Sequence, residues 1–598
     1  MRVRMSRLDE DSGIALITVI AMGFVMMLLA GAILSYGIAS MTQARRDQNY
    51  QAALAAADAG VDDYLYRVNN DSNYILYSTM ANTCTSPATP ANPDPANGAM
   101  SSFVPIPGGS TSALFRYDFD LSSYCAGGTI KVSSTGKVGT VTRTVSAVIK
   151  RKGFLDYLYF TDIEVQDPAL YTSNPFAGNP AYRPDLGDDN PSAVCGRHYY
   201  DKSADGALAA PRPDDVTNNP GCSTINFGGG DVINGPLHTN DAMLVCGNVT
   251  FNGPAYTSWT GSNPGLATNK HWRSNPNCSN NNPQFTGNNR NRCLGAGPSN
   301  DACYEPPLAM PPSNSALKAE TNPTITSPPG CLFTGPTKIT LRSDGKMDVV
   351  SPDTNTATAN PGCAPGTGLA IPTDGVVYVQ NVPSGAASVA CSSSNGVRFD
   401  GSGNVTSSTT GSPNRVNPVG YPVANDISSY GCTNGDLFVS GTLKGRLTLA
   451  AENNVVVTDD VTYASGVTGT DVLGLVANNN VEVYHPVYCT GFGTNGACTG
   501  FANLTTATNN LQLYAAILSV THSFRVQNYQ YGSQLGTLTV TGAIAQKYRG
   551  IVGIIGSSGF SKNYVYDSRL KYSSPPKFLD PVQSAYQVAN YSEQRSAY

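Results

Sequence analysis

Three aspartates in a segment rich in Pro, Asp and Asn have the composition of a metal site. Asp185, Asp188 and Asp189 lie in the stretch PDLGDDN. Carboxylate oxygens are the ligands that calcium prefers in proteins, so this segment is a candidate calcium site. A solvated acidic loop that binds nothing is the alternative. Asp459 and Asp460 form a weaker pair of the same kind.

Catalytic motifs do not occur in a suitable context anywhere in the sequence. No GxSxG, HExxH, Walker A or dinucleotide-binding fingerprint stands between the elements that it would require. His238 and Asp241, in PLHTND, could share a site or could simply occupy the corner of a strand. We therefore expect no enzymatic activity and, apart from the candidate calcium, no cofactor.

Fourteen cysteines, all after residue 83, indicate disulfides rather than a metal site. No CxxC pair occurs, and with only five histidines the sequence is poor in zinc ligands. Disulfides form in oxidising compartments and stabilise chains that are rich in loops. From their short separations we predict the pairs Cys489–Cys498 and Cys195–Cys222. The pairing of the remaining cysteines stays open.

The composition limits the class of protein. Charged residues make up 13% of the 598 residues and the formal net charge is -5, so a nucleic-acid partner is not expected. The 60 glycines and 40 prolines favour turns and short strands over helices. Disorder is the alternative, but alternating runs of Tyr, Val, Ile and Leu can bury a core. A chain of this length predicts two or more domains.

The elements that position these residues begin with an apolar N-terminal segment. Residues 1–13 are polar and contain three arginines, whereas residues 14–41 contain no charged residue. As a helix the second segment would be about 42 Å long, more than a bilayer core needs. A cleaved secretory signal and a plain membrane anchor are two interpretations. The third is a leader that is cut at Gly13, on the cytoplasmic side of a retained membrane helix.

The helix is predicted to continue beyond the membrane. Residues 42–70 are rich in Ala, Leu and Gln, which favour helices, and small or apolar residues recur every three or four positions from residue 52 to residue 68. One helix of about 80 Å would then run from the membrane to about residue 68. A soluble enzyme has little use for such a rod, whereas a subunit of a helical bundle needs one.

Two stretches resemble the PilX-type minor pilins and the K-type minor pseudopilins of type II secretion. They are GIALIT, which begins at Gly13, and AALAAADAG, which ends at Gly60. The resemblance implies cleavage after Gly13 by a prepilin peptidase and methylation of the new N-terminus at Ile14. Major pilins carry Glu at the fifth mature position, where this chain has Thr18. K-type pseudopilins share this absence, which implies a subunit that is located at the tip or initiates assembly.

The pilin resemblance also implies a small antiparallel sheet after the helix. Three alternating segments, 113–120, 129–134 and 139–150, predict its strands within a domain of residues 71–152. Residues 153–598 form a large β-rich domain, which resembles the β domains of large exported bacterial proteins with a PilX-like N-terminus. Its short strands with Asn-rich corners favour a parallel β-helix, with a β-sandwich as the alternative. Residues 260–330 and 350–430 are predicted to be loop insertions tied by disulfides.

The predicted function is that of a minor subunit of a type IV pilus or a type II secretion-like pseudopilus that presents a large extracellular β domain. Its partners would be other pilins, the prepilin peptidase, the membrane and a surface glycan or host ligand. The precursor would cross the cytoplasmic membrane once before it reaches the pilus or cell surface. A membrane-anchored adhesin is the alternative, followed by a polysaccharide-acting β-helix enzyme, since a solenoid can bring distant carboxylates together.

Overall fold

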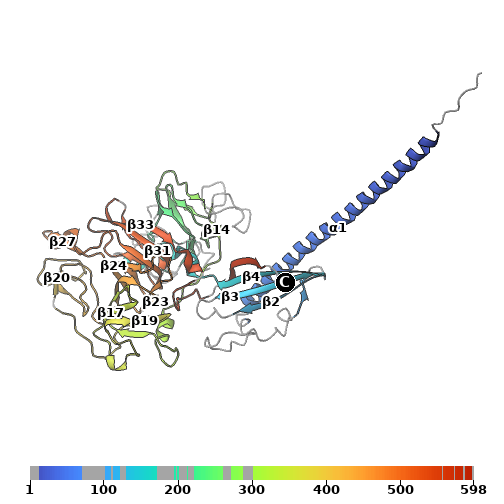
Figure 1. Cartoon of the computed structure of the whole chain (residues 1–598). Coiled ribbons are helices and arrows are strands. Elements are labelled where there is room, and N and C mark those ends of the chain that lie inside the picture. The colour runs from blue at the N-terminus through green and yellow to red at the C-terminus, as the bar shows by residue number, and fades with distance from the viewer. Residues whose placement is uncertain are drawn as a thin grey trace, which may run out of the picture. The chain divides into compact units, whose positions relative to one another are not determined.

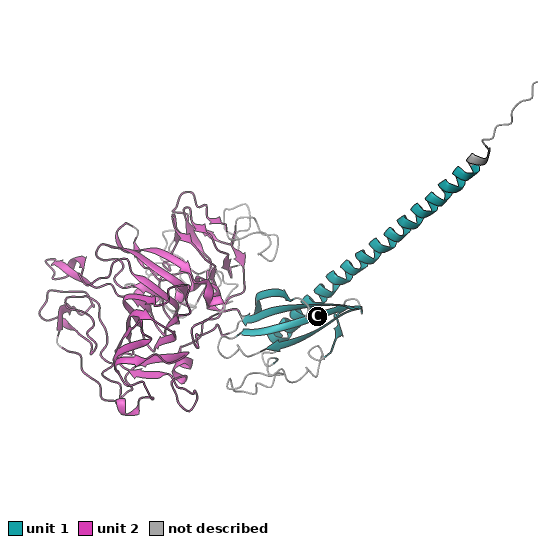
Figure 2. Cartoon of the chain, in the orientation of Figure 1, with its two compact units in different colours: residues 1–150, 586–598 teal, residues 151–585 magenta. Residues whose placement is uncertain are grey.

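The chain forms two compact units in this computed structural model, and the first is made of both ends of the chain. Unit 1 comprises residues 1–150 and 586–598, and unit 2 comprises residues 151–585 (Figure 2). The structure describes residues 12–70, 74, 102–108, 112–120, 129–171, 194–196, 198–200, 212, 221–259, 271–286, 301–392, 394–554, 556–571, 573–582 and 586–594.

Unit 1 is built on a single long helix, α1 (Ser12–Asn70). It joins the uncharged segment and the Ala-rich segment without a break, and in Figure 1 it appears as one straight rod. Neither segment contains proline, and good helix formers dominate the second. The predicted long N-terminal helix, followed by a large β-rich part, is confirmed.

A five-stranded sheet packs on the C-terminal half of α1. Strands β2 and β3 are antiparallel, with Tyr117 opposite Ser134, and β3 continues into β4 with Ser134 opposite Val145. Alternate residues of β2, among them Phe115, Tyr117 and Phe119, are buried in the core shared with the helix. The strands are β1 (Val104–Pro105), β2 (Ala113–Asp120), β3 (Thr129–Val138), β4 (Val141–Arg151) and β34 (Tyr586–Gln594), and they lie in that order across the sheet.

The C-terminal strand of this sheet differs from the predicted domain boundaries. Residues 153–598 are predicted to form one domain, but β34 lies beside β4 in unit 1. This pairing joins segments that are separated in the chain by the whole of unit 2. No local pattern in the sequence YQVANYSEQ indicates so distant a partner. Unit 2 is therefore an insertion between the last two strands of unit 1.

Unit 2 contains a long ladder of parallel strands, in which hydrogen-bonded neighbours come from separate parts of the chain. Val377, Leu449, Leu475 and Ile517 are in register on four successive strands and belong to one apolar core. The order is β14 (Cys303–Tyr304), β11 (Ala255–Thr257), β8 (Leu237–Thr239), β5 (Tyr159–Ile163), β31 (Gln534–Tyr548), β29 (Gln512–Ser519), β25 (Val472–Ala477), β23 (Arg446–Ala451), β19 (Gly375–Gln380) and β15 (Cys331–Thr334).

A second parallel ladder lines another side of the same core. Ile339, Val439, Val457, Val483 and Val526 are in register on its strands. Its strands are β16 (Thr337–Leu341), β22 (Leu437–Leu443), β24 (Val455–Tyr463), β26 (Val481–Val483) and β30 (Phe524–Val526). Successive segments such as β22, β23, β24 and β25 alternate between the two ladders.

The remaining elements flank these ladders. Strand β33 (Ser558–Tyr566) pairs with β31 in parallel. The other strands form short sheets and hairpins, and a short helix and 3-10 turns accompany them. They are β6 (Phe227–Gly228), β7 (Val232–Ile233), β9 (Leu244–Cys246), β10 (Thr250–Phe251), β12 (Arg273–Ser274), β13 (Gln284–Phe285), β17 (Lys346–Val350), β18 (Gly366–Ala370), β20 (Ser394–Phe399), β21 (Ser412–Arg415), β27 (Val487–Phe492), β28 (Cys498–Asn503), β32 (Gly553–Ile554), α4 (Ser315–Ala319), and the 3-10 turns η2 (Phe154–Asp156), η3 (Pro168–Leu170), η7 (Thr356–Thr358) and η8 (Ser568–Lys571).

Inner strands of the first ladder, such as β19, are buried on both faces. In β19, Val377 and Val379 enter the main core, whereas Val376 and Tyr378 enter a second apolar cluster with Leu317 of α4. Burial on both faces explains the nearly continuous apolar runs of these strands. The predicted loop insertion at 350–430 differs here, because it contains β19. Because the segments on both sides of β19 are rich in Pro and Gly, the composition of the whole region does not indicate this short apolar strand.

Polar residues form a hydrogen-bonded row at the start of the second-ladder strands, which we call the corner ladder. Asp436, Asn454, Asn480 and Ser523 each directly precede a strand, namely β22, β24, β26 and β30. The backbone N–H of Asn454 donates to Asp436 Oδ1 (3.1 Å), that of Asn480 to Asn454 Oδ1 (3.1 Å) and that of Ser523 to Asn480 Oδ1 (3.2 Å). The corner ladder satisfies backbone donors where the strands begin.

Candidate functional site

The N-terminal half of α1 is an apolar surface without cover. Its large hydrophobic side chains from Leu16 to Met41 are all more than half exposed, for example Met27 at 75%. No other part of the described chain buries this segment, which is long and apolar enough to cross a membrane. Exposed apolar area of this extent requires lipid or other protein as its surroundings.

Three hydroxyl groups in or just after this half donate to the backbone of the helix itself. Ser35 Oγ donates to the carbonyl oxygen of Gly31 (2.8 Å), Ser40 Oγ to that of Gly37 (2.9 Å) and Thr42 Oγ1 to that of Ile38 (2.8 Å). Such bonds to the preceding turn allow Ser and Thr to lie in apolar surroundings without an unpaired donor. The segment is thus suited to lipid or to a bundle of helices along its whole length.

The predicted processing residues lie at the beginning of this helix. Gly13 and Ile14 are in its first turn, and Thr18 is exposed on it. The proposed cleavage and methylation at these positions stay predictions. The calcium candidates Asp185, Asp188 and Asp189 lie outside the described residues. Within those that are described, no group of three His, Cys, Asp or Glu side chains has the arrangement of a metal site.

The C-terminal half of α1 lies against the sheet at backbone distance. A Cβ atom on Gly136 of β3 would come within 2.0 Å of the Ala53 carbonyl oxygen and 2.4 Å of the Ala57 nitrogen. A Cβ on Gly60 would come within 2.2 Å of Ser134 Oγ. Small residues are therefore required on both elements, which gives a physical reason for the Ala-rich stretch that ends at Gly60.

Polar contacts fix the same interface. Tyr117 OH donates to Asp63 Oδ2 (3.0 Å), and Arg67 Nε donates to the same oxygen (2.8 Å). The hydroxyls of Tyr74 and Tyr117 are 2.7 Å apart. Burial, together with the hydrogen bond to Tyr74 and the charge of Asp63, raises the pKa of Tyr117 well above its usual range. The hydroxyl therefore stays protonated and continues to donate.

The C-terminal strand holds the helix from the edge of the sheet. Asn69 exchanges two hydrogen bonds with the backbone of Tyr586, at 3.0 and 2.5 Å. Tyr591 OH bonds to Asp58 on the helix, and Glu593 pairs with Arg143 of β4. Residues from the far end of the chain thus complete the support of α1, and the sequence pattern contains no indication of them.

The predicted disulfide pairs are both present in unit 2. Cys195 is bonded to Cys222, and Cys489 is bonded to Cys498 across the β27–β28 hairpin. The described residues contain three further disulfides, Cys246–Cys278, Cys331–Cys363 and Cys391–Cys432. Disulfides of this number are typical of a domain in an oxidising compartment.

His238 and Asp241 do not form a common site. Asp241 accepts from Arg212 Nη1 (2.8 Å), and both side chains are fully buried. His238 Nε2 lies 3.0 Å from Asn240 Oδ1, and its ring stacks on Phe160. His238 also lies 3.4 Å from Glu305 Oε2 through Nδ1, so each residue has its own protein partners and the motif is structural.

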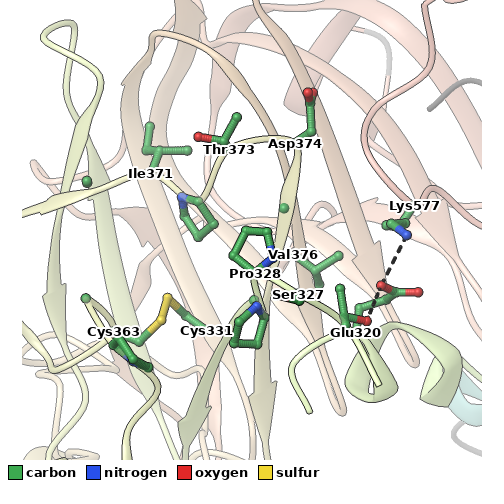
Figure 3. Close-up of a pocket in the computed structure, with 18 residues that line it drawn as sticks. Glu320, Ser327, Pro328, Cys331, Cys363, Ile371, Thr373, Asp374, Val376 and Lys577 are labelled. Carbon is green, nitrogen blue, oxygen red and sulfur yellow. Dashed lines mark hydrogen bonds and ion pairs between the residues drawn. A yellow bond between two sulfur atoms is a disulfide. The ribbon is translucent and has the colours of Figure 1, made fainter. Parts of the chain in front are cut away.

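A pocket of about 410 Å³ lies beside the Cys331–Cys363 disulfide (Figure 3). Its walls include Pro328, Ile371 and Val376. The charged groups at its edge are paired with protein groups. Lys577 Nζ lies 3.3 Å from Glu320 Oε2, and Asp374 accepts from Arg446 Nε at 2.7 Å. With its charges paired, this pocket offers an incoming ligand little polar recognition.

A second pocket, of about 390 Å³, lies beside the corner ladder and differs in its chemistry. Asp436, Glu482, Arg525 and Gln527 line it together with Tyr430. No sequence pattern indicates this group, since the five residues come from three separate segments of the chain. The available signal was Asp436 itself, which occupies the position before a strand where the other corners carry Asn454 and Asn480.

Comparisons with known proteins give no family assignment. No family model and no curated protein matches the chain. Among solved structures, the crystal structure of the competence-associated pilin ComZ from Thermus thermophilus aligns over 91% of this chain and 97% of that chain, with 12% sequence identity and a TM-score of 0.24. A TM-score of this size is too low to establish a shared fold.

Proposed function

We propose that this chain is a minor subunit of a type IV pilus or a type II secretion-like pseudopilus. Helix α1 first spans the membrane and then packs among the helices of other subunits. The observation that carries the proposal is the division of α1 into two halves. Its first half exposes a predominantly apolar surface without charged residues from Leu16 to Met41, and its second half is fixed to a sheet by Ala53, Ala57 and Gly60.

This division supports assembly over simple anchoring. A membrane anchor needs about 20 apolar residues, whereas α1 continues as one rigid element into a folded domain. A rigid rod transmits the position of the membrane segment to the domain, which a subunit of a helical filament requires. A flexible linker would suffice for an anchored adhesin.

We place the subunit at the tip or at the start of assembly. Thr18 stands where a carboxylate would pair with the N-terminal amine of a neighbour, and a buried charge without its partner is costly. Unit 2 also adds 435 residues, from 151 to 585, to a pilin-sized unit 1. A domain of that bulk at every subunit would crowd the filament surface, which favours low copy number.

We further propose that unit 2 is a parallel β-helix displayed outside the cell. Alternation of consecutive strands between two parallel ladders, a continuous apolar interior and the hydrogen-bonded corner ladder support this architecture. The disulfides favour an extracytoplasmic location. The prepilin peptidase, the membrane and other pilins are the partners that follow from the proposal.

The mature N-terminus tests the proposal. The protein is purified from membranes of its native host, or of a host with a prepilin peptidase, and its N-terminal peptide is analysed by mass spectrometry. The expected product begins at Ile14 and carries one N-methyl group. The variant Gly13→Ala should retain residues 1–13. A wild-type protein with an intact leader would refute the proposal. So would a protein cut as a secretory signal near the small residues Ala30, Gly31 and Ala32.

A further inference from the structure

The pocket beside the corner ladder contains a buried carboxylate that the fold does not use fully. Asp436 is 1% exposed and lines the pocket. Its Oδ1 atom accepts from Asn454 N (3.1 Å), Asn454 Nδ2 (3.0 Å) and Asn453 Nδ2 (2.5 Å). No donor among the described residues reaches Oδ2. One oxygen of this side chain is therefore available to a molecule in the pocket.

The corner ladder does not require a carboxylate at this position. Asn454 and Asn480 accept the next backbone N–H through an amide oxygen, with distances equal or similar to that of Asp436. Asparagine would thus satisfy the structural role. Burial raises the pKa of Asp436 to about 7, so the charged form is costly to keep here. An acceptor retained at such a cost indicates a ligand that donates to it.

The other charged groups of the pocket neutralise each other. Arg525 donates to Glu482 Oε2 through Nε (3.1 Å), and its Nη2 lies 3.0 Å from the same oxygen. Gln527 Nε2 donates to Glu482 Oε1 (3.2 Å) and to the hydroxyl of Tyr430 (2.5 Å). The Arg525 side chain is 23% exposed and lines the pocket. The pocket thus combines one free acceptor with a neutral pair, amides and hydroxyls.

These groups favour a hydroxyl-rich ligand over an anion or a metal ion. The two carboxylates disfavour an anion, and the charge of Arg525 does not offset them because it is already paired with Glu482. A metal ion would need more oxygen or nitrogen ligands than converge here, since no suitable group of three occurs in the described chain. A hydroxyl group donates to one oxygen and accepts from another group, which fits Asp436 Oδ2 on one side and Arg525 on the other.

We propose that this pocket binds a single neutral sugar residue of a surface glycan, with a sugar hydroxyl donating to Asp436 Oδ2. Tyr430 and Tyr529 line the same pocket and offer aromatic surface to the apolar face of a pyranose ring. A volume of about 390 Å³ suits a small ligand. The proposal concerns unit 2 alone and does not depend on how α1 assembles.

The test uses the full chain in lauryldimethylamine oxide, a detergent without a sugar head group. The probes are the methyl glycosides of glucose, galactose, mannose and N-acetylglucosamine in the millimolar range, and saturation-transfer NMR reports binding. At least one glycoside should bind. The variant Asp436→Asn should weaken its binding about tenfold or more, since a hydrogen bond to a charged group is lost.

Two further variants separate binding from folding. Ser429→Trp places bulk at an exposed position of the pocket without disturbing the core and should also abolish binding. Asp459→Asn removes an exposed carboxylate of β24 that does not line the pocket and should leave binding unchanged. Failure of all four glycosides to bind would overturn the proposal. Binding that persists in Asp436→Asn and Ser429→Trp, or that is lost in Asp459→Asn, would do the same.

Discussion

Gly136 of strand β3 lies directly against the backbone of Ala53 in helix α1. A methyl group at Gly136 would come within 2.0 Å of the Ala53 carbonyl oxygen, so the two elements touch without an intervening side chain. This contact sets how closely the rod approaches its sheet. It joins the two features on which the functional proposal depends, namely a long exposed helix and a folded unit that holds it rigidly.

The variant Gly136→Ala should destabilise unit 1. The added methyl group must displace helix backbone rather than a flexible side chain, and such overpacking costs about 1–3 kcal/mol. Urea unfolding followed by circular dichroism measures the change. Gly401→Ala is the matched control, because nothing lies within 4 Å of the added atom. Equal stability of the two variants would contradict the close contact.

Truncation before Tyr586 should loosen the C-terminal half of α1. It removes β34 and with it the contacts of Tyr586 with Asn69, of Tyr591 with Asp58 and of Glu593 with Arg143. Faster amide exchange is expected at Tyr50–Val68, by roughly the tenfold or more that corresponds to about 1.4 kcal/mol of lost local stability. A chain that ends after Gln594 keeps β34 and should exchange like the full chain. Unchanged exchange in the shorter chain would show that β34 does not support the helix.

Removal of the two predicted disulfides should have unequal costs. The Cys195–Cys222 bond closes a separation of 27 residues and both cysteines are fully buried, whereas Cys489–Cys498 closes 9 residues of a hairpin. Loop-closure entropy gives about 3.6 kcal/mol for the first and about 2.6 kcal/mol for the second. Paired Cys→Ala variants in oxidising buffer test this by urea unfolding. A larger loss from the hairpin disulfide would contradict the expectation.

The stability of unit 2 should depend on pH through Asp436. The pKa of this carboxyl is raised from 3.8 to about 7, so the folded state holds its proton more tightly than the unfolded state. The contribution of Asp436 to the free energy of unfolding is therefore largest below pH 4. It falls by up to about 4 kcal/mol as the pH rises to about 7. Asp436→Asn should remove this part of the pH dependence, and Asp459→Asn should not. A slope between pH 4 and 7 that is the same in Asp436→Asn as in the wild type would exclude the assignment.

Local patterns in the sequence predicted the elements whose partners are near in the chain. The uncharged residues 14–41 and the Ala-rich continuation predicted α1, and alternation over 113–120 coincides with β2. The Asn-rich corners predicted by composition form the corner ladder, in which Asn454 and Asn480 bond along the stack. In each case, one short stretch contains the physical cause of the structure.

Features that depend on distant partners could not be predicted. Strand β34 pairs beside β4 across 434 intervening residues (152–585), and β19 lies within a Pro- and Gly-rich region. The pocket at Asp436 requires Glu482 of β26 and Arg525 of β30, which lie later in the chain. Its residue types are ordinary in a polar surface, and only their convergence in space gives them a role.

Photo-crosslinking from the middle of the exposed half of α1 tests whether this helix packs among the helices of other subunits. Benzoylphenylalanine replaces Leu28, which is 60% exposed, and the same probe at Tyr66, on the half that packs on the sheet, serves as the control. We expect the probe at position 28 to crosslink to the N-terminal helix of another subunit in sheared filament fractions. Crosslinks to lipid alone, or mature protein that has lost residues 14–41, would contradict it.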